Sequence, residues 1–146
     1  VYKRQDRKSG EQKVFEADSR FTKNVVEKCE SGNYEQWERH NIENPHFYDL
    51  MYLPQTGMYA RLHLGGIEFD ATRDILNLMD DRDLYLTFFD KDFVVVGEAK
   101  LPSHRYNYFT GWRETNDGVA LFVDNSLDEN EKTEELVLDI VRLQAD

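Results

Sequence analysis

Three polar side chains at alternate positions are the strongest candidates for ligand binding in this sequence. Tyr59, Arg61 and His63 are each separated by one residue, and residues with this spacing project from the same face of an extended strand. The guanidinium of Arg61 can hold a carboxylate or a sugar through paired hydrogen bonds, and the ring of Tyr59 can stack on a sugar. Such a face could line a polar binding groove, but the interpretation that we favour is the solvent-exposed face of an antiparallel sheet.

Trp112 is the fourth candidate for a binding role. It stands in a strand-like stretch with Phe109, between Gly111 and Arg113. A tryptophan in this setting either packs in the core, which we favour, or forms the rim of a sugar-binding surface.

No metal site, cofactor or catalytic residue is predicted. The four histidines form neither a His-x-His pair nor a helical i, i+4 pair, the spacings that zinc sites commonly use. Asp90 and Asp92 are better explained as turn residues than as calcium ligands. Gly65-Gly66 lacks the further residues of a phosphate-binding loop and indicates the exit of a strand. No Gly-x-Ser-x-Gly motif is present, so the sequence favours a protein without enzymatic activity.

The charge balance restricts the partners that the protein can have. The chain has 29 acidic and 18 basic residues, a formal net charge of -11 at pH 7. A surface of this sign repels phosphate backbones and anionic lipid headgroups, so nucleic acid is not an expected partner. Cys29 is the only cysteine, which excludes an internal disulfide and leaves the cellular compartment undetermined.

These side chains must be positioned by β-strands. The 146 residues, 40% of them hydrophobic, suffice for one core. Alternating or β-branched apolar runs separated by turn residues predict antiparallel strands. The nine predicted strands cover residues 1–7, 12–18, 47–53, 58–64, 84–89, 93–101, 108–114, 119–123 and 135–143.

Two short helices interrupt this pattern. Residues 33–40 begin with Asn33 and have Gln36 three positions later, which is typical of a capping box. Residues 70–79 begin with Asp70 and place apolar residues on one helical face.

The predicted fold is therefore all-β and consists of antiparallel meanders with two short helical insertions. Residues 47–101 supply four strands and residues 108–143 supply three. Residues 1–18 supply two more, and residues 19–46 form a helical connector. We expect the chain to be a single domain or a fragment of a larger one.

Several of these stretches resemble a known family. They are 48–52 with 58–61, the hairpin 84–98 with its Phe-Asp-Lys-Asp-Phe turn, and 117–121. Together they are similar to the C-terminal part of an uncharacterised family of Bacteroidetes lipoproteins, which itself resembles six-bladed β-propellers of the TolB-like kind. The resemblance covers about residues 47–143, with a weaker extension over 13–21.

The resemblance implies an exported, lipid-anchored parent protein in the periplasm or at the outer membrane or cell surface. It supplies no activity and no catalytic residues. A propeller needs at least four blades of four strands, so nine strands would form only part of one. We therefore expect blade remnants at about 1–18, 47–101 and 108–143, and self-association through open sheet edges. The start Val1-Tyr2-Lys3 lacks an initiator methionine, as a processed chain or a piece of a longer protein would.

Three functions are compatible with these expectations. The favoured one is a non-catalytic exported β-propeller module that recognises a protein or glycan partner. The alternatives are a fragment of a carbohydrate-active enzyme and a self-contained β-barrel that binds a small ligand in its interior.

Overall fold

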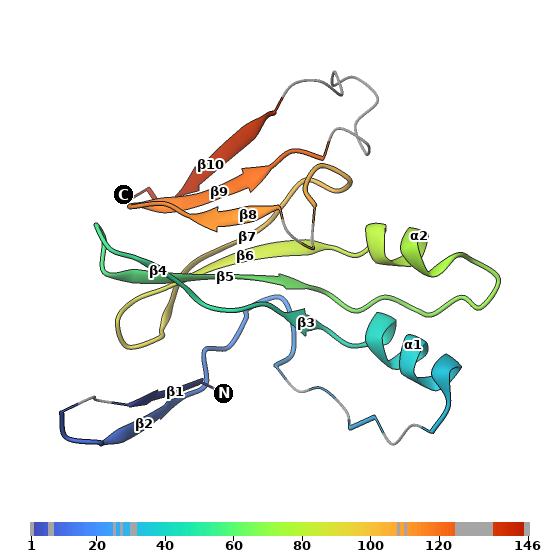
Figure 1. Ribbon diagram of the computed structural model, residues 1–146, viewed down its shortest axis with the longest axis horizontal. Coiled ribbons are helices and arrows are strands. Elements are labelled where there is room, and N and C mark those ends of the chain that lie inside the picture. The colour runs from blue at the N-terminus through green and yellow to red at the C-terminus, as the bar shows by residue number, and fades with distance from the viewer. Residues whose placement is uncertain are drawn as a thin grey trace.

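Ten strands and two helices occur in the part of the chain that the computed structural model describes, residues 2–5, 8–24, 26, 28–29, 32–107, 109, 111–124 and 136–144. The strands are β1 (Tyr2–Gln5), β2 (Gln12–Phe15), β3 (His46–Phe47), β4 (Met51–Leu53), β5 (Met58–Leu64), β6 (Leu84–Phe89), β7 (Val95–Lys100), β8 (Trp112–Glu114), β9 (Gly118–Phe122) and β10 (Leu138–Arg142). The helices are α1 (Tyr34–Glu43) and α2 (Ile75–Asp80) (Figure 1). The predicted all-β class is confirmed.

The central sheet is an antiparallel meander in which β5 pairs with β6 and β6 pairs with β7. The other edge of β5 pairs with both β3 and β4. The predicted strand 47–53 is therefore split into two short strands, and Tyr48 N still donates to Leu62 O between them at 3.1 Å. The broken strand and the three strands after it reproduce the predicted four-stranded order.

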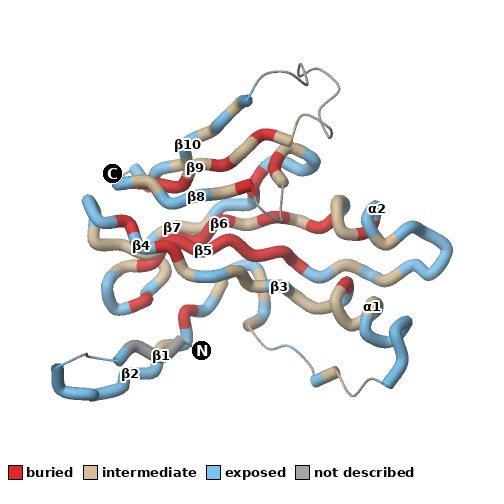
Figure 2. Tube along the Cα trace, in the orientation of Figure 1, coloured by how far each residue is buried: buried red, intermediate tan, exposed pale blue. Residues whose placement is uncertain are grey.

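A second antiparallel sheet, with the order β10-β9-β8, packs on one face of the central sheet. Ala60, Leu62 and Leu64 of β5 point into this interface, where they are buried with Val119 and Leu121 of β9. Figure 2 shows the buried residues concentrated along β5 and β6 and along β9. Strands β8 and β10 are shorter than predicted, and residues 108, 110 and 125–135 lie outside the described part of the chain.

The opposite face of the central sheet is also buried, so the expectation of a solvent-exposed face at Tyr59, Arg61 and His63 is wrong. Arg61 is 2% exposed and His63 is 0% exposed. Residues 15–24, which we call the covering segment, lie over this face. Arg61 Nη2 donates to Ala17 O at 3.1 Å. The expected exposure was wrong because alternating polar residues mark one face of a strand but do not show whether a distant segment of the chain covers that face.

Further contacts hold the covering segment on the sheet. Arg20 Nη2 donates to Val95 O at 2.8 Å, and Arg20 N donates to the carboxylate of Glu98 at 2.6 Å. The other carboxylate oxygen of Glu98 accepts from Thr87 Oγ1 at 2.7 Å. Ala17 also forms a small apolar cluster with Phe89 and Phe93. Among the described residues of the predicted helical connector 19–46, only those of α1 are helical, and the first residues of the connector are held by the sheet.

Short connections join β1 to β2 and β4 to β5, and both strand pairs are antiparallel, as predicted. β1 pairs with β2 alone among the described strands. Gly57 adopts a positive φ of 69° and its N–H donates to Leu53 O at 2.9 Å. In the turn between β6 and β7, the side chain of Asp90 accepts from the N–H groups of Asp92 and Val94 at 2.8 and 2.9 Å. Asp90 is therefore a turn residue, as expected.

The helices begin at capping residues. Asn33 accepts from Glu35 N at 3.0 Å, which confirms it as the cap of α1. The helix extends three residues beyond the predicted end and stops before Pro45, which disfavours helical backbone at the residue that precedes it.

The second helix starts later than predicted, so the expected boundary at residue 70 is wrong. Asp70 instead closes a local turn by accepting from Thr72 N at 2.9 Å. Asp74 is the cap of α2 and accepts from Leu76 N at 2.8 Å. Both acids are good caps, and the sequence could not show which one initiates the helix.

Gly66 allows α1 to pack closely on the chain that leaves β5. Ile67 N donates to Ile42 O at 3.0 Å, and a Cβ on Gly66 would lie well inside van der Waals contact of Glu43 O. We expect Gly66→Ala to lower the free energy of unfolding in urea by about 1–3 kcal/mol, because the backbone must shift. Gly32→Ala is the control, because no atom lies within 4 Å of a Cβ added at Gly32. Equal midpoints for the two variants would contradict this role of Gly66.

Candidate ligand-binding cleft

The pairing register places both helices at one end of the central sheet. His46 of β3 pairs with Leu64, and Leu64 pairs with Leu84 of β6. The chain before His46, which contains α1, and the excursion from Gly65 to Asp83, which contains α2, therefore leave the sheet at the same end. Figure 1 shows α1 and α2 side by side there.

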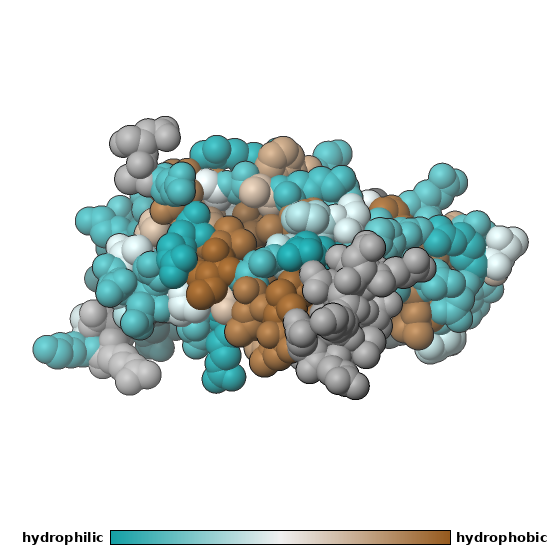
Figure 3. Space-filling view, turned by 90° about the horizontal axis from the view of Figure 1, so that it is seen from above, coloured by the Kyte–Doolittle hydropathy of each residue, from teal (hydrophilic) through white to brown (hydrophobic). Residues whose placement is uncertain are grey.

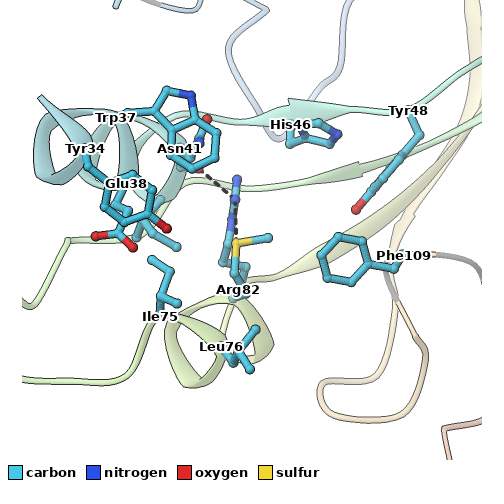
Figure 4. A pocket seen from close by; sticks show the side chains of 12 residues that line it. Tyr34, Trp37, Glu38, Asn41, His46, Tyr48, Ile75, Leu76, Arg82 and Phe109 are labelled. Atoms are coloured by element: carbon cyan, nitrogen blue, oxygen red, sulfur yellow. Dashed lines mark hydrogen bonds between the residues drawn. The ribbon is translucent and has the colours of Figure 1, made fainter. Parts of the chain in front are cut away.

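A cleft of about 520 Å³ opens between these helices. Helix α1 contributes one wall, and α2 contributes Ile75, Leu76 and Met79 to a second. His46, Tyr48 and Phe109 form the third side, opposite α1 (Figure 4). The volume lies within the range of about 300–1,000 Å³ that is usual for small-molecule sites.

An exposed pair of aromatic rings forms the α1 wall. Tyr34 and Trp37 are 72% and 50% exposed, and their rings stack with centroids 5.9 Å apart and planes inclined by 27°. The i, i+3 spacing on a helix brings the two side chains together. They offer apolar faces to the cleft that no other part of the described chain covers.

The facing side is also rich in aromatic rings. His46 lies edge-on to Tyr48 at 4.8 Å, and Tyr48 packs against Trp112 at 4.5 Å. Phe109 is exposed. Partial burial, and then the positive charge of Arg82, lower the pKa of His46 below its usual range. Both effects disfavour the charged form of its ring.

Arg82 forms the floor of the cleft and holds its walls together. Its side chain is 4% exposed. Nε donates to Gly65 O at 2.7 Å, Nη1 to Asn41 O at 2.8 Å and Nη2 to Asn44 O at 2.7 Å. One guanidinium thus joins the carboxyl end of α1 to the segment after β5 and to the end of α2.

Two polar side chains on the α1 wall are available to a ligand. Glu38 and Asn41 are half-buried and line the cleft. Within the residues that the structure describes, no hydrogen bond or ion pair engages the side chain of either one. The neighbouring acid Glu43, by contrast, pairs with Arg39 at 3.2 Å.

The four candidates from the sequence do not lie together around this cleft. Arg61 and His63 lie beneath the covering segment on one face of β5, so a ligand would have to displace that segment to reach them. Tyr59 lies on the same face but is half-buried, and its ring stacks on Phe93 with centroids 4.7 Å apart. Trp112 packs partly buried against the core, as favoured, and supports Tyr48 from behind.

The sequence reasoning missed Tyr34, Trp37, Phe109 and Arg82. The i, i+3 aromatic pair on a predicted helix was a signal that pointed to the first two. Nothing in the sequence shows that Arg82 is buried, because its partners are backbone carbonyls up to 41 residues away.

No group of three or more histidine, cysteine or acidic side chains suited to a metal ion is found in the described part of the chain. A search of the same residues finds no helix of sufficient length and apolar character to cross a membrane.

The fold and the cleft define an all-β protein built from packed antiparallel meanders, with a ligand-sized cleft at one end of its central sheet. No protein-family model matches the chain, and no curated protein is similar to it in sequence. Among solved structures, the chain is similar to a member of the DUF4221 family from Bacteroides vulgatus, with 17% sequence identity and a TM-score of 0.57. The similarity covers 73% of this chain and 30% of that one.

This likeness shows a shared fold. At that level it supports the resemblance to an uncharacterised Bacteroidetes family that the residues suggested. The chain spans less than a third of the length of the solved protein.

Proposed function

We propose that this chain is a non-catalytic module of a β-propeller that recognises its partner through the aromatic cleft between α1 and α2. The observation that carries the proposal is the stacked pair Tyr34 and Trp37, which stays exposed on the wall of a ligand-sized cleft. Exposed aromatic surface is unfavourable in water, and a bound partner removes it from water. The helix that carries these rings, α1, is anchored by Arg82, so the cleft is formed before a ligand arrives.

The proposal includes an exported, lipid-anchored parent, for which the family resemblance is the support. It also includes self-association through the second sheet. Leu138 and Ile140 on the outer face of β10 are exposed, and they are paired with Phe122 and Ala120. Figure 3, seen from the side of this sheet, shows an apolar patch there. An apolar face of this kind is suited to packing against another sheet.

Binding by the whole chain to a glycan array and to a random peptide library tests the recognition role. We expect ligands in at least one of the two, bound at least tenfold more weakly by Trp37→Ala, since one ring of the platform is lost. Tyr52→Ala is the matched control, because Tyr52 is an exposed aromatic residue on β4, at the other end of the sheet.

Three outcomes would contradict the proposal. The first is that neither library yields a ligand. The second is that Trp37→Ala binds as tightly as the unchanged chain, and the third is that a bound glycan is recovered cleaved. Unchanged binding by Trp37→Ala would favour a ligand inside a barrel, and cleavage would favour an enzyme fragment.

A further inference from the structure

We infer that the cleft takes an uncharged oligosaccharide, one ring of which stacks on Tyr34 and Trp37 while its hydroxyls bond to Glu38 and Asn41. This inference rests on the proposed function, since it names the class of ligand for the same cleft. It follows from the aromatic faces, the available polar groups, the charges and the extent of the cleft.

The walls suit a ligand that is apolar on its faces and polar at its edge. The stacked Tyr34 and Trp37 rings present flat apolar faces. A pyranose ring presents C–H groups on its faces and hydroxyls around its rim. Its face can therefore pack on an aromatic ring while the rim reaches polar groups beside that ring.

The polar groups that remain available match hydroxyls. A carboxylate accepts hydrogen bonds only, whereas an amide both donates and accepts, and each hydroxyl of a sugar can do both. Glu38 and Asn41 thus provide complementary partners on one helix face. Hydroxyl bonds to a carboxylate are charge-assisted, which makes them short and strong.

The same geometry disfavours a peptide that binds as an added strand. Such a peptide is held by backbone hydrogen bonds, which need free carbonyls or N–H groups along the site. The carbonyls of Asn41 and Asn44 at the end of α1 already accept from Arg82. Recognition in the cleft therefore depends on the side chains that line it and not on backbone groups.

The charges favour a neutral ligand. A cation in the cleft would approach the guanidinium of Arg82 in its floor. An anion would approach Glu38, with Glu35 and Asp74 in the adjoining hollow, on a chain of net charge -11. Arg73 also lines this hollow, but it is paired with Asp81 at 2.6 Å. An uncharged ligand avoids both repulsions.

The cleft is longer than one sugar ring needs. A second hollow of about 480 Å³ adjoins it, and Glu38 and Ile75 line both. The second hollow is bordered mainly by polar residues of α1 and the turn before α2. A chain of sugars can therefore place one ring on the aromatic wall and extend past Glu38 into the polar hollow.

Titration of the whole chain with neutral oligosaccharides of one to six units tests this inference, with tryptophan fluorescence and calorimetry as readouts. The probes are gluco-, manno- and xylo-oligosaccharides, compared with oligogalacturonates as anions, chitosan oligomers as cations and the peptide library. We expect a neutral series to bind with an affinity that rises at least tenfold from one unit to three. We also expect affinities that stay within twofold between about 0.05 and 0.5 M salt, since no charge pairing is involved.

Glu38→Gln provides the residue-level test. It keeps the size of the side chain and removes its charge, so we expect at least a tenfold loss of affinity with an unchanged urea midpoint. Glu114→Gln, on β8, is the matched control. Binding only of anionic glycans, cationic glycans or peptides would overturn the inference and leave the proposed function standing. Full affinity of Glu38→Gln for a neutral glycan would also overturn it, and binding of no probe at all would overturn both.

Discussion

Replacing Arg82 by methionine is expected to lower the free energy of unfolding by about 3–5 kcal/mol, because three backbone carbonyls lose a charged donor and each such loss costs about 1–3 kcal/mol. Methionine fills a similar volume but donates no hydrogen bond. The carbonyls of Gly65, Asn41 and Asn44, now bonded at 2.7–2.8 Å, would lose their partner in a buried setting. Two of them lie at the carboxyl end of α1, where carbonyls lack helical partners and a cation is also favoured by the helix dipole.

Urea denaturation followed by tryptophan fluorescence measures this loss. Arg82→Lys is the informative second variant, because lysine keeps the charge but cannot place three donors in a planar fork. We expect it to recover less than half of the loss. Arg113→Met is the matched control, since Arg113 is exposed on β8 and should stay within about 0.5 kcal/mol of the unchanged chain.

A lysine variant as stable as the unchanged chain would show that charge alone matters at this position. A methionine variant with an unchanged urea midpoint would contradict the role of Arg82 as the anchor of the cleft.

The stability of the protein is expected to fall by up to about 3 kcal/mol between pH 6.5 and pH 4 through His63 alone. The ring is 0% exposed and stacks on Tyr85 with centroids 4.9 Å apart. Its Nε2 lies 3.1 Å from Thr22 Oγ1 and 3.4 Å from Ser19 Oγ. Burial, followed by the nearby charge of Arg61, lowers the pKa of His63 from 6.5 to about 4, and Glu98 raises it in part.

The direction of the pH effect follows from which state binds the proton. The unfolded chain takes up a proton at His63 near pH 6.5, whereas the folded chain resists it until about pH 4. Between these values the unfolded state holds more protons, so the free energy of unfolding rises with pH. This contribution is fully present above pH 6.5 and is lost as the pH falls toward 4.

His63→Gln isolates the titration from all other groups. We expect this variant to be less stable at pH 7. Between pH 6.5 and pH 4, its free energy of unfolding should fall by about 3 kcal/mol less than that of the unchanged chain, as measured by urea denaturation at several pH values. Thr22→Val is the control, since it removes the 3.1 Å contact but keeps the imidazole, and the slope should persist. Parallel curves for the unchanged chain and His63→Gln would contradict the assignment.

Protonation of His63 should act first on the covering segment. Thr22 and Ser19 belong to it, and so does Ala17, whose carbonyl Arg61 binds. Two neighbouring positive charges beneath the segment would weaken these contacts before the apolar interface with β9 is exposed. The aromatic cleft lies at the end of the sheet and does not include these residues.

Local features of the sequence were sufficient for the elements themselves. Gly57 adopts a positive φ in its turn, Asp90 binds the backbone of its own loop, and Asn33 caps α1. Each of these interactions joins residues within four positions of one another, so the residue types carry the information. Ala60, Leu62 and Leu64 share the buried apolar face of β5, because alternation along a strand determines which side chains lie on the same face.

The sequence by itself thus determined the all-β class, the hairpins and the two helices, because short-range hydrogen bonds and side-chain periodicity decide them. The tertiary structure alone decided that Arg61 and His63 are covered, that Asp74 rather than Asp70 starts α2, and that Trp37 faces Phe109 across a cleft. Those outcomes depend on residues that are tens of positions apart and meet only when α1 and α2 leave the same end of the sheet. Their contacts arise from packing and burial in three dimensions, for which residue type and local spacing carry no signal.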